Sequence, residues 1–140
     1  MKAWVQEYLN LPFQDRGRTR EGVDCYGLVR LIYQERLKIE LPSYTEAYAT
    51  TADHEEIKAL VRGEAGSRWR QIELAEAVTY DGLIFRILGQ PTHFGMVLDP
   101  PWFIHAVKRD RQAVGRTWLE RWDAHDWRHR LVAAVRWQGA

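Results

Sequence analysis

The chain has 140 residues, which is enough for one domain with its own hydrophobic core, and we expect a single domain over residues 1–140. Charged residues make up 28% of the sequence and nearly balance, leaving a formal net charge of +1. This balance gives no electrostatic argument for nucleic acid or an anionic membrane as the main partner. The single cysteine excludes an internal disulfide, so the fold must depend on packing.

The first residues carry no targeting signal. Residues 1–13 lack the continuous apolar stretch and the small-residue cleavage site of a signal peptide. No apolar run approaches the roughly 18 residues of a membrane span. We therefore expect synthesis in the cytoplasm without a signal peptide, and delivery by another route if the protein acts outside the cell.

Helical patterns dominate the first half of the sequence. Apolar residues at helical spacing predict a short helix within residues 2–10, and Pro and Gly residues predict a loop over 11–22. A stronger pattern predicts a helix over 25–37 that ends before Pro42. A further helix is expected over 53–62, which begins with a capping Asp and is followed by Gly.

The second half of the sequence has patterns typical of β-strands. A long loop with one helical turn around Trp118 is expected over residues 108–130. Helices followed by strands predict an α+β fold with an antiparallel sheet. The predicted strands are 68–74, 82–88, 93–98, 102–107 and 131–137.

The only cysteine, Cys25, lies at the start of the helix predicted over 25–37. Asp24 is a good N-cap, which places Cys25 at the first helical position. The N–H groups and the dipole at a helix start favour a thiolate and can bind the oxyanion of a tetrahedral intermediate. Cys25 is therefore either a nucleophile or a small core residue, because free cysteine is among the most buried residue types.

A nucleophilic cysteine needs a nearby base, and two of the five histidines fall in a predicted hairpin. With a three-residue connection over 99–101, Gly95 lies opposite His105, and His93 shares a face with His105 as its diagonal neighbour. A register slip of one residue would put the two rings on opposite faces. This arrangement predicts a line of Cys25, His93 as base and His105 as orienting residue. The alternative is that both histidines are polar residues on a half-exposed sheet.

The remaining histidines suggest no second site. His54, His125 and His129 are assigned to the solvated surface without a role, and residues 122–130 to a charged, aromatic edge. A structural zinc site needs about four ligands at paired close spacings, which one cysteine and scattered histidines do not supply. We therefore expect neither a metal nor another cofactor.

Three blocks of the sequence resemble the NlpC-type cysteine peptidases. They occur in the order found in that family, and the match as a whole runs from about Pro12 to Val107. The blocks are GVDCYGLVRLIYQERLKIELPSY (22–44), which resembles the nucleophile helix, DGLIF (81–85), which resembles a strand opening, and THFGMVLDPPWFIHAV (92–107), which resembles the His-x-Gly strand with its partner strand.

The resemblance implies a papain-like α+β domain in which the nucleophile helix packs on an antiparallel sheet. Carried over by position, Cys25 is the nucleophile, His93 the general base and His105 the orienting residue. It further implies hydrolysis of peptide bonds in bacterial peptidoglycan stem peptides, typically between D-glutamate and a diamino acid. The short chain and the lead-in over residues 12–25 are most similar to phage tail members, which implies incorporation in a phage tail with tail-tip proteins as partners.

Three features depart from the family pattern. Tyr26 follows the cysteine where serine is frequent, Phe13 stands where relatives carry a tyrosine, and Asp81–Gly82 reverses the usual Gly-Asp order. We assign Asp24, Tyr26 and Phe13 to substrate binding.

The sequence thus predicts a cysteine endopeptidase of peptidoglycan. Two alternatives stay open: a structural tail-tip protein with little or no hydrolase activity, and an amidase or acyltransferase on the same fold.

Overall fold

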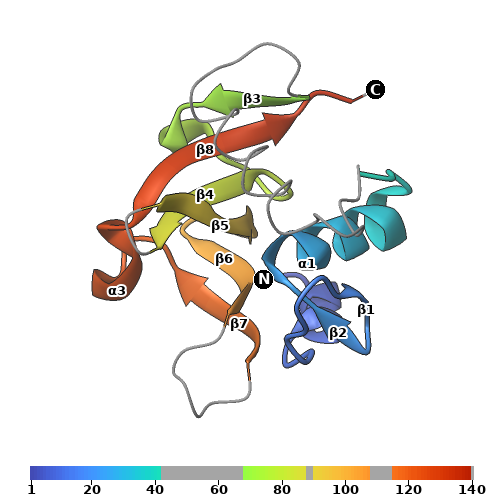
Figure 1. Cartoon of the computed structure of the whole chain (residues 1–140). Helices are drawn as coiled ribbons and strands as arrows, with labels where there is room; N and C mark the ends of the chain where they lie inside the picture. The colour runs from blue at the N-terminus through green and yellow to red at the C-terminus, as the bar shows by residue number, and fades with distance from the viewer. Residues whose placement is uncertain (42–67, 88–89, 108–114, 140) are drawn as a thin grey trace.

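The computed structural model describes residues 1–41, 68–87, 90–107 and 115–139, and its main element is a six-stranded antiparallel sheet (Figure 1). The strands are β3 (Trp69–Ile72), β4 (Gly82–Ile87), β5 (Gln90–Val97), β6 (Trp102–Val107), β7 (Arg116–Arg121) and β8 (Leu131–Trp137). Their spatial order is β3-β8-β4-β5-β6-β7, so β3 and β7 are the edges. The helix predicted over 53–62 lies outside the described residues.

The helix predicted to begin at Cys25 forms where the sequence predicted it. Helix α1 (Cys25–Ile32) continues into the π-helical turn η2 (Tyr33–Leu37) and ends at Lys38, whose φ of 58° is left-handed. Asp24 caps its start, because one carboxylate oxygen accepts the N–H of Gly27 at 2.6 Å. With helices before an antiparallel sheet, the predicted α+β class is confirmed.

The segment before α1 differs in part from the prediction. Its first helix, η1 (Ala3–Tyr8), has 3-10 geometry. The predicted loop over 11–22 was wrong at its end, since β1 (Arg18–Thr19) and β2 (Gly22–Val23) form a small hairpin. Two glycines make this close packing possible: a Cβ on Gly17 would lie 2.3 Å from the carbonyl oxygen of Gly22.

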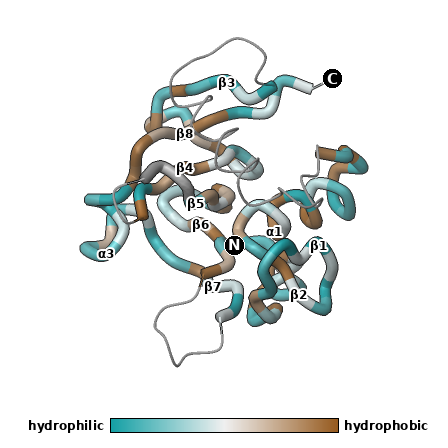
Figure 2. Tube along the Cα trace, in the orientation of Figure 1, coloured by the Kyte–Doolittle hydropathy of each residue, from teal (hydrophilic) through white to brown (hydrophobic). Residues whose placement is uncertain are grey.

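The sheet carries a hydrophobic cluster on each face, as strand alternation requires. On one face, the side chains of α1 pack against the sheet, and apolar segments of α1, β4 and β8 are brown in Figure 2. This cluster includes Leu28, Val29, Ile32, Phe94, Met96 and Ile104. The other face is covered by the segment around α3 (His125–Arg128), and its cluster includes Leu83, Phe85, Val97, Phe103, Trp122 and Trp127.

The prediction of a loop with a helical turn around Trp118 was wrong. Residues Arg116–Arg121 form β7, which pairs along β6, and the helical turn is α3 further along the chain. The outer side of β7 is bonded to the N-terminal segment: Thr117 donates its N–H to the carbonyl of Leu11, and Phe13 donates its N–H to the carbonyl of Gly115. These tertiary bonds hold β7 extended although its sequence is highly charged.

The reversed Asp81–Gly82 pair has a structural explanation. Asp81 is buried and accepts two hydrogen bonds from the guanidinium of Arg136, each at 2.9 Å. Gly82 lies against Phe94, whose Cζ atom would be 2.4 Å from a Cβ at that position. The order of the two residues therefore suits an ion pair of a buried carboxylate with a half-buried guanidinium, and a close aromatic contact. In the ranges described above, no helix has the length and apolarity needed to cross a membrane.

We expect Asp24→Ala to destabilise the protein by roughly 2–4 kcal/mol, because it removes the cap and leaves the nearly buried guanidinium of Arg18, which bonds Asp24 at 2.6 Å, without this partner. Asp24→Asn keeps a capping side chain and should cost less. Chemical denaturation measures both, with the exposed Asp15→Ala as control. An Asp24→Ala protein as stable as the control would contradict this role.

Candidate active site

Two histidines form the centre of the candidate site. Nε2 of His93 and Nδ1 of His105 are hydrogen-bonded at 2.7 Å, and the residues are only 5% and 0% exposed. The predicted hairpin register is confirmed, since Met96 pairs with Ile104 and Val97 with Phe103. The alternative of two polar residues on a half-exposed sheet was therefore wrong.

The two rings meet where β5 and β6 part. Among the described residues, the register between these strands extends over two pairs next to the turn and not as far as His93. Gly95 lies between the rings and the registered pairs: a Cβ there would be 3.0 Å from the ring of Phe103 and 3.4 Å from Cβ of His105. Glycine at this position thus avoids a tight contact with the ring of Phe103, which packs against His105.

A carboxylate that the sequence analysis missed contacts this pair. Oε2 of Glu120, on β7, lies 2.5 Å from Nε2 of His105. Glu120 pairs with Phe103 across the ladder and is therefore the diagonal neighbour of His105 on the same face. The alternation of Thr117 and Leu119 with Trp118 and Glu120 was the available signal.

Aromatic side chains surround the histidine pair. The ring centroid of Trp127 lies 4.6 Å from that of His105 and 5.9 Å from that of His93, and Phe85 and Phe103 complete the surroundings. Burial lowers the pKa of His93 well below its ordinary value, and repulsion from His105 whenever that ring is protonated, and from Arg130, lowers it further. His93 is therefore neutral at neutral pH and able to accept a proton.

Cys25 occupies the first position of α1 and is half-buried. Helix α1 contacts both β5 and β6, the strands that carry the histidines. The ring of Tyr26 meets that of Phe94 edge-on, with centroids 5.6 Å apart. The residue that follows Cys25 in the sequence is thus in contact with the residue that follows His93. The first turn of α1 thus packs against β5 next to the position of His93. Proton transfer between Cys25 and His93 stays a prediction.

The residues assigned to substrate binding have structural contacts. Asp24 caps α1 and pairs with Arg18. Tyr26 is 4% exposed and belongs to the core cluster, while Phe13 is half-buried beside it. Their role in substrate binding stays a prediction.

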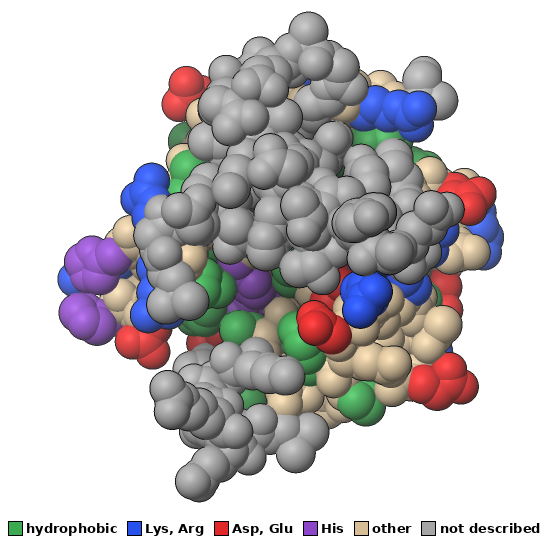
Figure 3. All heavy atoms as spheres, in the orientation of Figure 1, with side chains coloured by type: hydrophobic (Ala, Val, Ile, Leu, Met, Phe, Trp, Pro, Cys, Tyr) green, Lys and Arg blue, Asp and Glu red, His purple; other side chains and the backbone are tan. Residues whose placement is uncertain are grey.

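The other histidines are separate from the pair. His125 and His129 are exposed on and beside α3, as predicted, with ring centroids 5.2 Å apart. Figure 3 shows histidine side chains projecting at one side of the molecule and a histidine recessed near the centre of the same face. His54 lies outside the described residues, and the part of the chain that is described holds no cluster of three potential metal ligands.

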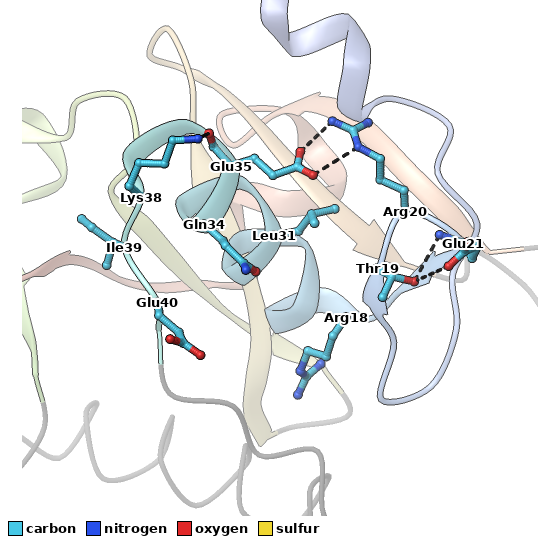
Figure 4. Close-up of a pocket in the computed structure, with 10 residues that line it drawn as sticks. All are labelled: Arg18, Thr19, Arg20, Glu21, Leu31, Gln34, Glu35, Lys38, Ile39 and Glu40. Carbon is cyan, nitrogen blue, oxygen red and sulfur yellow. Dashed lines mark hydrogen bonds and ion pairs between the residues drawn. The ribbon is translucent and has the colours of Figure 1, made fainter.

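A hollow of about 810 Å³ lies elsewhere, between the β1–β2 hairpin and the C-terminal end of the helix formed by α1 and η2 (Figure 4). Arg20 extends across it to the carboxylate of Glu35, with the shorter contact at 2.6 Å. Neither Cys25 nor the histidine pair lines this hollow. Its size alone does not make it a site, because the acidic and basic side chains that line it form ion pairs with each other, as Arg20 does with Glu35.

Comparison with solved structures identifies the fold. A lipoprotein-like NLP/P60 protein from Staphylococcus aureus is 20% identical, with a TM-score of 0.64, and the match covers 97% of this chain but 39% of that one. The NlpC/p60 domain of the peptidoglycan hydrolase SagA is 20% identical, with a TM-score of 0.60, over 96% of this chain and 93% of the domain. An NlpC/P60 protein from Bacillus cereus is 17% identical, with a TM-score of 0.65, over 95% of this chain and 37% of its own.

These likenesses confirm the predicted papain-like, NlpC-type fold. This chain spans well under half the length of the Staphylococcus aureus and Bacillus cereus proteins. A search of curated protein sequences found no match. A sequence model of the NlpC/P60 family matches residues 10–136, which include Cys25, both core histidines and Glu120; the chain therefore belongs to the NlpC/P60 family.

Proposed function

We propose that this protein is a cysteine peptidase that hydrolyses a peptide bond in the stem peptides of bacterial peptidoglycan. The observation that carries the proposal is the buried, hydrogen-bonded pair of His93 and His105 on two strands that contact the helix beginning with Cys25. A structural role for the pair does not require a lone cysteine at the adjacent helix start.

The comparisons support the substrate class. The family match covers most of the chain, and SagA, whose NlpC/p60 domain is similar to this chain over nearly its full length, is a peptidoglycan hydrolase. The finer assignment, cleavage between D-glutamate and a diamino acid, rests on the sequence resemblance. Location in a phage tail rests on it too and is part of the proposal.

In the proposed reaction, Sγ of Cys25 attacks the carbonyl carbon of the scissile bond, and the thiol proton moves to Nδ1 of His93. The C–N bond then breaks, and the imidazolium of His93 returns the proton to the leaving amine. Water hydrolyses the thioester with His93 again as base, which restores the thiol. Throughout, Nε2 of His93 stays bonded to His105, so Nδ1 is the ring atom that serves Cys25.

The position of Cys25 also suits the transition state. As the first residue of α1, it lies at the positive end of the helix dipole, which lowers the pKa of a thiol. The backbone N–H of Cys25 is the donor we assign to the oxyanion of the tetrahedral intermediate.

We expect Cys25→Ala to lower hydrolysis roughly 10³-fold or more with the free energy of unfolding nearly unchanged. The assay follows new amino termini and product masses after incubation with muropeptides. Masses showing an amide or transfer product would favour the amidase or acyltransferase alternative. A wild-type protein that gives no product and does not react with iodoacetamide at neutral pH would favour the structural one.

We expect His93→Ala to reduce kcat/KM nearly as much as Cys25→Ala, and His105→Ala to reduce it less, because an orienting residue contributes less than the base. His125→Ala, on the exposed surface, is the matched control and should leave the rate unchanged. Equal activity in the His93→Ala and His125→Ala proteins would remove His93 from the mechanism.

The acid limb of the kcat/KM profile should have its midpoint below pH 6.5, the ordinary pKa of histidine. A general base works when unprotonated, so activity is lost as pH falls through its pKa. Because burial, His105 and Arg130 lower the pKa of His93, activity should persist to a lower pH than for an exposed histidine. A midpoint well above 6.5 would contradict this environment for His93.

A further inference from the structure

We propose that Glu120 is a positioning residue that fixes the tautomers of both histidines, so that Nδ1 of His93 is unprotonated and faces the thiol of Cys25 as an acceptor. The idea rests on the proposed function for its purpose, but the tautomers can be observed without any activity. It assigns a role to a carboxylate that lies two hydrogen bonds away from the reacting atoms.

The first step of the argument is the contact between Glu120 and His105. The side chain of Glu120 is 14% exposed, and its Oε2 lies 2.5 Å from Nε2 of His105. A carboxylate only accepts hydrogen bonds, so the proton in this contact belongs to His105. A neutral His105 with its proton on Nε2 has a lone pair on Nδ1.

In the second step, the tautomer of His105 determines the tautomer of His93. The 2.7 Å contact joins Nδ1 of His105 to Nε2 of His93, and a lone pair on the former requires a proton on the latter. Neutral His93 then has its own lone pair on Nδ1. This is the tautomer that a base needs if Nδ1 is the atom that serves Cys25.

The heavy-atom positions of the pair would be equally compatible with the reverse arrangement. In that case His105 donates from Nδ1, His93 accepts at Nε2, and neutral His93 carries its proton on Nδ1, where it cannot accept another. The pair alone does not distinguish these two arrangements. The carboxylate does, because the reverse one would set a lone pair on Nε2 of His105 against the negative oxygen of Glu120.

The other charged and titratable groups around the pair do not make the same choice. Arg130, before β8, lowers the pKa of His93 by its positive charge. The contacts at Nε2 of His93 and at both ring nitrogens of His105 are those within the pair and with Glu120. Cys25, from α1, is the proton donor in the proposed reaction. Phe85, Phe103 and Trp127 are uncharged and exclude water, which would otherwise offer both a donor and an acceptor.

Glu120→Gln is the decisive variant. Its amide oxygen can accept from Nε2 of His105, and its amide nitrogen can donate to the same atom, so it removes the preference while keeping the shape. Glu120→Asp keeps the charge and is the conservative variant. Glu35→Gln, which replaces a carboxylate hydrogen-bonded by Tyr8 and Arg20 away from the pair, is the matched control.

The experiment is long-range ¹H–¹⁵N NMR of the histidine rings in the full chain at a pH where both are neutral, combined with steady-state kinetics. In the wild-type protein, we expect both His93 and His105 to carry their proton on Nε2. In Glu120→Gln, we expect the Nδ1–H form of His93 to appear and kcat to fall about 10- to 100-fold with KM nearly unchanged. Glu120→Asp should restore the wild-type tautomers at least in part.

A wild-type His93 with its proton on Nδ1 would overturn the inference, whatever the variants do. Unchanged tautomers and kcat in Glu120→Gln would overturn it as well. The expected tautomers in a protein that hydrolyses no peptidoglycan would support the role of Glu120 and reject the proposed function. The two ideas can therefore fail separately.

Discussion

The hydrogen bond between His93 and His105 is the contact on which the rest of the candidate site depends. It joins two strands at the point where their backbone register no longer holds them together. Two buried imidazoles are costly unless their nitrogens find partners, and each ring satisfies the other here. The aromatic side chains around the two rings keep water away from this bond. The bond is therefore stronger than it would be in water, and its loss would leave two buried nitrogens without a partner.

The histidine pair and helix α1 lie on opposite faces of the sheet. Alternation along β5 directs Phe94 toward α1 and His93 toward the cluster around Trp127. A continuous ladder between β5 and β6 would separate the helix that carries the thiol from the histidines. The proposed mechanism therefore requires the thiol of Cys25 to approach His93 at the point where this ladder has ended. Gly95 and the hairpin register are the sequence features that permit this arrangement.

Much of the site could be predicted from the sequence because local rules determine it. A three-residue turn and the two-residue period of strands place His93 beside His105, and Asp24 before an apolar stripe places Cys25 at a helix start. Glu120 could not be found in this way, since the charges around it obscured the alternation of β7.

Tertiary contacts explain the remaining differences. The pairing of Asp81 with Arg136 joins residues 55 positions apart, which no local pattern reveals. Strand β7 likewise owes its extended form to its pairing with β6 and to hydrogen bonds with the N-terminal segment rather than to its own composition. The predicted helix over 53–62 and His54 lie outside the described residues and stay predictions.

The N-terminal segment also affects the tendency of the protein to aggregate. An uncovered outer strand offers backbone groups to any other extended chain and so invites aggregation. Leu11 and Phe13 occupy those groups along part of β7, the strand that presents Glu120 to the histidines. The same few residues thus protect the edge of the sheet against association and support the geometry of the candidate site, and proteolytic cleavage within them would weaken both.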